Sequence, residues 1–558
     1  MQACLRVLVP LFLLFASFTM NGQLAIPGRP MPDNGQLKAG EVIYLLPPLS
    51  DLQTEALLQE AEESDLKLMK YATERGLDLD PANHGAWTNW DTFRVWRVHI
   101  ISPGAFSLGL ELGEYNLRKG VNLFVFNPRR DVVRGAYGSH NNKPYGTLAI
   151  GHLPGEELIL ELQVPLGMED FGSLRVSSLY HAFKQPGGTK DKRFGRSHDC
   201  EIDVACEEGN AWLRQRRAVV RINTGREWCT GVMLNNTDYD GTPYVLTAQH
   251  CIPNQDRAEG SEFCFNYDSP SCFGGDGSTT QSISGAELVA VGDSIDFSLV
   301  KLSLNPPAHF KPYFAGWDLD AQQSGPSVVI HHPEGDVKKI SIDEDDISEP
   351  ESLSDIPNTD LRDYYYFSFW WVKNWEWGVT EGGSSGSPLF NKRGLVIGTL
   401  TGGKATCLDS IDFDAQKKRT IYRKVEDDYF TKLNVAWNYY APDGPVLKSW
   451  LDPGNTGAKA VQGFYPYSNA TDKVPGLSAL KLYPNPASDF LHIECTPVHG
   501  RVRYRILDAQ GRAVLSGSWL EMPQPVQTLE LSQLSPGIYF LELGWTDGRA
   551  SGIFTLDR

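Results

Sequence analysis

The stretch YVLTAQHC (residues 244–251) is an apolar strand that runs into a histidine flanked by a cysteine. Later in the chain, DFSLVKL (residues 296–302) is an alternating strand headed by a carboxylate, and GGSSGSPL (residues 382–389) is a glycine- and serine-rich turn that leads into a strand. A serine hydroxyl attacks an amide only when a neighbouring base accepts its proton and a third group orients that base. The three stretches therefore supply a base, an orienting carboxylate and a nucleophile, in that order.

The predicted catalytic residues are His250 as the base, Asp296 as the orienting group and Ser385 as the nucleophile. Their order along the chain matches the chymotrypsin-like arrangement, and their spacing leaves room for one β-barrel to carry the first two and a second barrel to carry the serine. Asp293 is a competing carboxylate, but Asp296 is preferred because it directly precedes the strand. Small residues around the serine allow the backbone N–H groups of Gly383 and Ser385 to form an oxyanion hole.

The composition sets the class and the compartment. The chain has 558 residues, enough for three or four domains of roughly 150 residues each. It carries 51 Lys and Arg against 69 Asp and Glu, a net charge of −18, so binding to nucleic acid is not expected. Residues 1–22 carry one basic residue, Arg6, followed by an apolar run from Val7 to Phe18 that is too short to span a bilayer, which predicts a signal peptide. Export favours disulfides over metal ligands for the clustered cysteines, so neither a metal site nor a cofactor is expected.

Residues 23–193 are predicted to form a pro-region made of a helix and a β-sandwich. Residues 50–76 are expected to form one helix, because Ser50 and Gln53 make a capping-box pair and Gly76 suits its end. From residue 93 to about residue 176, short apolar strands of period two alternate with Gly/Pro turns, as in a β-sandwich. The polar, basic stretch that follows predicts a domain boundary that a trypsin-like enzyme would cut near Arg193 or Arg196.

The central part of the chain, residues 194–465, resembles the trypsin-like serine proteases and, among them, the bacterial lysyl endopeptidases. The matching stretches are CEIDVAC (200–206), TAQHC (247–251), IDFSL (295–299), AGWD (315–318), IHHP (330–333), residues 380–389 and WLDP (450–453). The resemblance implies a chymotrypsin-like double β-barrel and a serine endopeptidase that cleaves protein or peptide substrates through an acyl-enzyme. A catalytically silent surface adhesin or binding protein on a protease fold is the alternative.

The resemblance also implies three disulfides and a substrate pocket. The implied disulfides join Cys200 to Cys407, Cys206 to Cys272 and Cys229 to Cys251, and they leave Cys264 and Cys495 without an assigned partner. The expected substrate-binding residues are Thr380, Thr401, Gly402, Gly403 and Thr420.

The pocket departs from the family pattern at the position that holds a lysine. Lysyl endopeptidases place an aspartate two residues before a Tyr-x-x-Val segment, and here YRKV (residues 422–425) puts Thr420 in that place. Without a buried anion a lysine side chain loses its charge-paired anchor, so the residue preference stays open. Asp409, Asp412 and Asp414 either replace the missing anion or belong to a solvated loop.

A histidine pair, an acidic run and a cluster of tryptophans each allow two interpretations. His331 and His332 suggest a metal pair, but neighbouring residues of a strand point to opposite faces, which favours a structural role. The acidic run at residues 343–351 is either a calcium site or a solvated loop. The tryptophans at residues 370–377 either wall a substrate subsite or pack in the core.

Residues 476–558, after a linker at 466–475, resemble a type IX secretion C-terminal sorting domain. The matching stretches are LYPNPASD (482–489), ILDAQGR (506–512) and LSPGIY (534–539). The resemblance implies a small β-sandwich that is recognised by the outer-membrane secretion machinery, and hence a secreted or cell-surface protein. An ordinary carbohydrate- or protein-binding β-module is the alternative. The whole chain is therefore expected to be mainly β, with a central two-barrel domain between two β-sandwiches.

Overall fold

The computed structural model divides the chain into two units, Met1–Pro466 and Tyr467–Arg558. It describes residues 28–32, 43–62, 66–184, 197–357, 359–414, 419–425, 427–439, 446–467, 481–494, 502–508, 513–519, 526–545 and 548–557. The predicted signal peptide, the cut sites at Arg193 and Arg196, and Cys495 lie outside these ranges. Within them, no helix is both long enough and apolar enough to cross a membrane.

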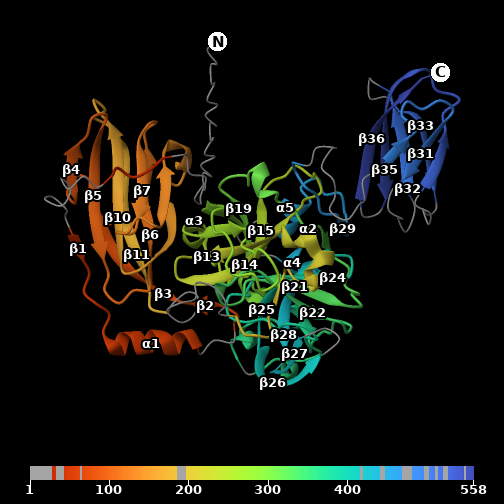
Figure 1. Ribbon diagram of the computed structural model, residues 1–558. Helices are drawn as coiled ribbons and strands as arrows, with labels where there is room; N and C mark the ends of the chain where they lie inside the picture. The colour runs from red at the N-terminus through yellow and green to blue at the C-terminus, as the bar shows by residue number, and fades with distance from the viewer. Residues whose placement is uncertain are drawn as a thin grey trace, which may run out of the picture. The chain divides into compact units, whose positions relative to one another are not determined.

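The first part of the Met1–Pro466 unit is a β-sandwich (Figure 1). Its six-stranded sheet consists of β1 (Ile43–Leu45), β4 (Ala86–Asn89), β5 (Phe93–Ile101), β7 (Asn122–Phe126), β8 (Val133–Tyr137) and β10 (Glu157–Pro165). The four-stranded sheet consists of β3 (Ala72–Leu79), β6 (Ser107–Leu117), β9 (Leu148–Pro154) and β11 (Gly172–Ala182). Side chains such as Trp96, Leu110 and Leu160 are fully buried in one shared cluster. The predicted sandwich is confirmed.

The helix predicted over residues 50–76 is wrong in its second half. The α1 helix (Asp51–Glu62) begins at the expected capping box, with Gln53 N donating to Ser50 Oγ over 3.3 Å. From Leu66 onward the chain is extended: it forms β2 (Met69–Lys70) and then β3, which contains Gly76. Tertiary packing overrides the helical pattern here, because this segment pairs with a distant strand and buries Met69 in a separate apolar cluster.

The central part of the chain forms two sheets (Figure 1). The first contains β13 (Val219–Asn223), β14 (Glu227–Leu234), β15 (Tyr244–Thr247), β16 (Glu262–Phe265), β17 (Ser282–Ser284), β18 (Ala286–Gly292) and β19 (Phe297–Leu302), in the order β17-β16-β13-β14-β15-β19-β18. The β2 strand joins this sheet at β14. The short helix α2 (Leu213–Arg216) precedes β13 in sequence, and α3 (Gln255–Glu259) lies between β15 and β16.

The second sheet contains β12 (Ile202–Asp203), β20 (Trp317–Asp318), β21 (Ser327–His331), β22 (Lys339–Asp343), β23 (Phe369–Val372), β24 (Pro388–Asn391), β25 (Val396–Gly403), β28 (Asp428–Lys432) and β29 (Ala460–Val461). A separate ribbon pairs β26 (Thr406–Asp414) with β27 (Arg419–Val425). The helices α4 (Leu433–Ala436) and α5 (Leu447–Leu451) follow β28. One hydrophobic core draws on both sheets, from Leu246 in the first to Ile330 in the second.

Trp317 links the two sheets of the central part. Its indole is fully buried, and its Nε1 donates to the carbonyl oxygen of Asn235 over 2.8 Å. Its ring also packs on Trp437, with the ring centroids 4.6 Å apart. The side chain therefore combines apolar burial with a satisfied polar atom, as large aromatic core residues do.

The Tyr467–Arg558 unit is a smaller β-sandwich. One sheet consists of β30 (Lys481–Tyr483), β31 (Phe490–Glu494) and β34 (Val526–Glu530), and the other of β32 (Val502–Leu507), β33 (Ala513–Trp519), β35 (Gly537–Trp545) and β36 (Gly548–Leu556). Leu491, Ile506, Leu541 and Phe554 are fully buried in its core. The predicted mainly β fold class, with a sandwich before and after a central two-sheet part, is thereby confirmed.

Replacing Trp317 by alanine should destabilise the protein by about 3–5 kcal/mol, because it empties a buried site and leaves the Asn235 carbonyl without its donor. A shift of the urea unfolding midpoint measures this loss. The control is Leu353→Ala, because Leu353 is 46% exposed and its truncation should cost no more than about 0.5 kcal/mol. Equal midpoints for the two variants would contradict the role assigned to Trp317.

Candidate active site

His250 and Asp296 meet because two neighbouring strands carry them. The β15 and β19 strands pair antiparallel, with Thr247 opposite Ser298, and this register sets the residues just beyond them side by side. His250 Nδ1 lies 3.0 Å from each carboxylate oxygen of Asp296, and His250 N donates to Asp296 Oδ1 over 3.0 Å. Asp296 is fully buried and adopts the left-handed conformation, with φ 58°. The carboxylate thus fixes both the imidazole ring and its backbone.

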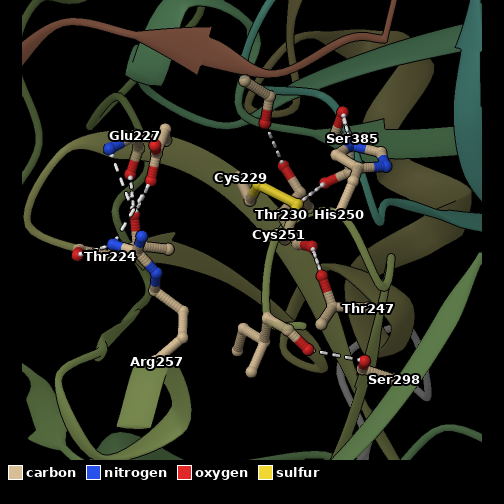
Figure 2. Close-up of a disulfide and its surroundings, with 12 residues drawn as sticks. Thr224, Glu227, Cys229, Thr230, Thr247, His250, Cys251, Arg257, Ser298 and Ser385 are labelled. Carbon is tan, nitrogen blue, oxygen red and sulfur yellow. Dashed lines mark hydrogen bonds and ion pairs between the residues drawn. A yellow bond between two sulfur atoms is a disulfide. The ribbon is translucent and has the colours of Figure 1, made fainter. Parts of the chain in front are cut away.

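Ser385 reaches the same place from the second sheet. It lies on the turn before β24, and its Oγ is 2.7 Å from His250 Nε2. Figure 2 shows the two side chains facing each other beside the Cys229–Cys251 disulfide. The backbone fixes the turn, because Thr230 N donates to the carbonyl oxygen of Ser385 over 2.8 Å. His250 is therefore within hydrogen-bond reach of both other predicted catalytic residues, Asp296 through Nδ1 and Ser385 through Nε2.

The competing carboxylate, Asp293, does not join this group. It is exposed, and its Oδ1 accepts hydrogen bonds from the backbone and the side chain of Ser294. It lies in a short 3-10 turn ahead of Asp296.

The two predicted oxyanion donors converge on one carbonyl oxygen, that of Lys67. Gly383 N donates to Lys67 O over 2.6 Å, and Ser385 N donates to it over 3.0 Å. Gly383 has φ 92°, and a Cβ there would approach the carbonyl oxygen of His332 to 2.7 Å. Only glycine leaves room for this turn, which aims both N–H groups at the same point.

A pocket next to Ser385 holds the side chain of Lys67. The side chain is buried, and its Nζ donates to Ala405 O over 2.6 Å and to Thr380 O over 3.2 Å. The Thr380 hydroxyl in turn donates to Asp428 Oδ2 over 2.8 Å. An ammonium group in this pocket therefore meets two carbonyl oxygens and lies in the field of a buried carboxylate.

Asp428 was missed by the sequence analysis. It is fully buried, its Oδ2 also accepts from Trp375 Nε1 over 2.7 Å, and no hydrogen-bond donor lies within reach of its Oδ1 among the described residues. Burial raises the pKa of this carboxyl to about 6, and the positive charge of Lys67 lowers it. Gly403 allows the close approach, because a Cβ there would lie 2.3 Å from Asp428 Oδ1. The sequence signal was an acidic residue heading an apolar strand, the same pattern that marked Asp296.

The other expected pocket residues are placed as follows. Gly402 forms an antiparallel bridge with Leu66, the neighbour of Lys67. The hydroxyl of Thr401 is buried and lies 3.0 Å from that of Thr431. Thr420 lies on the separate ribbon, paired with Phe413 in β26, and the structure does not describe its side chain. The ribbon also carries Asp409, Asp412 and Asp414, whose side chains are likewise outside the description.

Three disulfides join the described cysteines: Cys200–Cys407, Cys206–Cys272 and Cys229–Cys251. These are the pairs that the resemblance implied. Cys264 is buried with a free thiol, and burial raises its pKa to about 11, so it is a poor nucleophile at neutral pH.

The two histidines of the IHHP stretch are buried and hydrogen-bonded within the fold. His331 Nδ1 lies 2.7 Å from Ser384 Oγ, and His332 Nδ1 lies 2.9 Å from the carbonyl oxygen of Asp336. Burial lowers both pKa values, that of His331 to about 3, so both rings are neutral. His331 supports the turn that carries the nucleophile.

The acidic run brings two of its carboxylates together with that of Glu376. Asp343 and Asp345 place oxygens within 4.8 Å of one from Glu376, and burial raises the pKa of Asp343 to about 7. An acidic cluster alone does not identify a cation site, so no ion is assigned to it. Of the tryptophans, Trp370 packs in the core. Trp375 contacts the pocket indirectly, because its Nε1 donates a hydrogen bond to Asp428 Oδ2.

Two family models match this chain. Residues 194–422 match the lysyl endopeptidase C-terminal domain, and residues 481–551 match a secretion system C-terminal sorting domain. These matches confirm the resemblances inferred from the motifs, and they support a protease hydrolase at the family level. The sorting domain marks a secreted or cell-surface protein, as expected.

Curated relatives and solved structures are similar to parts of the chain. A lysyl endopeptidase of Pseudomonas aeruginosa is 29% identical over 293 residues, which cover 48% of this chain and 58% of that protein. The secreted RxLR effector protein 73 of Plasmopara viticola is 28% identical over 214 residues, which cover 37% of this chain and 49% of that protein. This chain thus spans only about half the length of these curated relatives. A solved structure of a Glu endopeptidase is 13% identical, and the match covers 44% of this chain and 94% of that one, with a TM-score of 0.26. A structure of kallikrein-related peptidase 10 is 15% identical, and the match covers 41% of this chain and 93% of that one, also with a TM-score of 0.26.

Gly386→Ala should destabilise the nucleophile turn by more than about 1 kcal/mol. Gly386 has φ 80°, and an added Cβ would lie 2.1 Å from Thr247 Oγ1 and 2.4 Å from Thr230 O. Urea unfolding in a Ser385→Ala background, which prevents self-digestion, measures the change. The control is Gly76→Ala, because a Cβ at that exposed position has nothing within 4 Å. A midpoint for Gly386→Ala equal to that of the control would show that the turn tolerates a side chain.

Proposed function

We propose that the protein is a secreted serine endopeptidase that cleaves peptide bonds on the carboxyl side of lysine. The observation that supports it best is the occupied pocket beside Ser385. A lysine side chain fills this pocket while its own carbonyl oxygen accepts from both oxyanion donors. The same arrangement would bind a lysyl substrate.

The chemistry follows from the three hydrogen-bonded side chains. Ser385 Oγ attacks the carbonyl carbon of the substrate and passes its proton to His250 Nε2, which lies 2.7 Å away. Asp296 holds the ring so that Nδ1 keeps its hydrogen and stabilises the imidazolium as it forms. The N–H groups of Gly383 and Ser385 accommodate the oxyanion. The imidazolium then protonates the leaving amine, and water hydrolyses the acyl-enzyme by the same route.

The preference for lysine rests on Asp428. A buried carboxylate stripped of water interacts strongly with an ammonium, and this one has an oxygen without a hydrogen-bond donor within the described residues. Asp428 thus takes the anionic role for which the family spacing pointed to Thr420, with Asp409, Asp412 and Asp414 as the other acidic candidates, and it gives the pocket a preference for lysine. Thr380 contributes both its carbonyl oxygen, which binds the ammonium, and its hydroxyl, which orients Asp428.

The remaining parts of the chain serve folding and export in this proposal. Residues 23–193 act as a pro-region, residues 1–22 as a signal peptide and residues 476–558, after the linker at 466–475, as the segment recognised by the outer-membrane secretion machinery. The alternative, a silent adhesin or binding protein, has no use for an aligned base and nucleophile, and activity measurements separate the two.

Ser385→Ala should abolish hydrolysis of lysyl peptides, and Asp296→Asn should lower kcat by about 10⁴-fold, because the amide would hold His250 in the wrong tautomer. Initial rates with a lysyl p-nitroanilide measure both effects. Ser387→Ala is the matched control, since its buried hydroxyl, two residues from the nucleophile, has no hydrogen-bond partner in the described structure and should be dispensable. Unchanged activity in Ser385→Ala would favour the silent binding protein.

Asp428→Asn should lower kcat/KM for lysyl substrates by about 100-fold or more, because it removes the charge that faces the ammonium. The neighbouring Asp427→Asn should change it by less than about threefold, since Asp427 is half-buried and binds Trp371 instead. A Thr420→Ala variant completes the series, and a large loss confined to Thr420→Ala would overturn the assignment of Asp428.

The ratio of kcat/KM for a lysyl substrate to that for a norleucyl substrate should fall as the pH drops below about 6. The carboxyl of Asp428, whose pKa burial raises to about 6, then becomes protonated and no longer pairs with the ammonium. The ratio cancels the titration of the catalytic groups, which both substrates share. A ratio that stays constant from pH 8 to pH 5 would mean that Asp428 does not select the lysine.

A further inference from the structure

We propose that residues 66–70 of the N-terminal region occupy the active site as a substrate does, and that Lys67–Leu68 is a bond that the protein cleaves in its own chain. The inference rests on the proposed function and adds a processing site. Lys67 lies in the pocket, and the expected cut sites at Arg193 and Arg196 fall outside the described residues.

On the acyl side of this bond, the segment binds as an added strand. Leu66 forms an antiparallel bridge with Gly402 at the end of β25. Lys67 then fills the pocket, and its carbonyl oxygen accepts from Gly383 N and Ser385 N. Backbone pairing, a filled pocket and an occupied oxyanion hole together place the Lys67 carbonyl where the nucleophile attacks.

On the amine side, a second pairing continues the same path. The β2 strand lies antiparallel to the start of β14, with Met69 opposite Trp228 and Lys70 opposite Glu227. Met69 is 2% exposed, so this pairing also buries a side chain. Trp228 directly precedes Cys229, whose disulfide partner follows His250 in sequence. The chain thus crosses the catalytic residues between two strand pairings, one on each side of the Lys67–Leu68 bond.

Tyr71 anchors the amine side against the first sheet. Its hydroxyl donates to Asn223 Oδ1 over 2.9 Å, its N–H donates to Arg226 O over 3.0 Å, and its ring stacks on Trp228 with the ring centroids 5.0 Å apart. The sandwich adds its own contacts, including Ser284 Oγ donating to Ala149 O over 3.0 Å. Since these contacts hold the segment in place, the bond is presented to Ser385 of the same chain at a high effective concentration.

Lys70 supplies a built-in comparison three residues away. It lies in the same extended segment, but its Nζ turns to the exposed Glu60 of α1 at 2.5 Å. Of these two nearby lysines, only Lys67 has its side chain in the pocket, so the path of the backbone decides which lysine is presented to Ser385.

The cleavage follows the route of the proposed function. Ser385 Oγ forms a bond to the carbonyl carbon of Lys67, the bond from that carbon to the nitrogen of Leu68 breaks, and the hydroxyl proton passes through His250 Nε2 to the Leu68 amine. Water then adds to the acyl-enzyme, which frees the carboxylate of Lys67 and restores the serine hydroxyl. Until that cut is made, the segment excludes other substrates.

The test uses the full-length protein, with N-terminal sequencing and intact-mass spectrometry over time at two protein concentrations tenfold apart. A fragment that begins at Leu68 should form at a rate that does not depend on concentration, and Ser385→Ala should form none. Lys67→Ala should reduce this cut by at least 100-fold, while Lys70→Ala should leave its rate within twofold of the wild type.

A separate measurement keeps the test valid if Lys67→Ala folds poorly. Lys67→Gln keeps the length of the side chain and removes its charge, and the labelling of Ser385 by a fluorophosphonate probe reports an assembled site. We expect Lys67→Gln to be labelled at least tenfold faster than wild type sampled before the cut. Labelling at the wild-type rate would show that the segment does not occupy the site.

The outcomes separate this inference from the function on which it rests. If the protein hydrolyses added lysyl peptides but yields no chain beginning at Leu68, the processing site is wrong and the endopeptidase stands. A rate of cutting that rises in proportion to the protein concentration would overturn the intramolecular step. If added peptides are not hydrolysed at all, the proposed function itself fails.

Discussion

The antiparallel pairing of β15 with β19 is the constraint on which the site depends. It opposes Thr247 to Ser298, so the residues beyond the two strand ends, His250 and Asp296, meet at 3.0 Å. The second sheet must then bring Ser385 Oγ to the other ring nitrogen of His250, Nε2. The hydrophobic core that the two sheets share holds them in the relative position that this contact needs. Because Asp296 is fully buried and is hydrogen-bonded by the backbone and the ring of His250, a shift of β15 against β19 would leave a carboxylate unpaired in the interior.

A second buried carboxylate is the basis of the selectivity that we propose. Asp428 heads β28 as Asp296 heads β19, but it faces a pocket instead of a histidine. Donors from Thr380 and Trp375 satisfy one of its oxygens, and the glycine at residue 403 lets the neighbouring strand pass close to the other. Burial raises the pKa of this carboxyl, and the positive charge of Lys67 lowers it, so a nearby ammonium favours the ionised form.

The N-terminal sandwich and the catalytic part form one unit through a short extended segment. The helical pattern that begins at residue 50 ends at Glu62, and the chain is extended from Leu66 because two distant strands accept it as a neighbour. The same contacts that overrule the local propensity place Lys67 in the pocket. Docking of the N-terminal sandwich and burial of the Lys67 side chain beside Ser385 are therefore coupled.

The sequence by itself determined the mainly β class and the N-terminal sandwich through period-two patterns, and it predicted the triad of His250, Asp296 and Ser385 from local motifs. The three disulfide pairs and the C-terminal sandwich came from family resemblances. The sequence missed Asp428, since the family spacing pointed to Thr420 and an acidic residue before a strand says nothing about which pocket it faces. It also missed the role of Lys67, which is 313 residues from Thr380 and 338 from Ala405. Only the tertiary structure decides such contacts, because burial of a charge and the hydrogen bonds that offset it depend on segments that no local pattern connects.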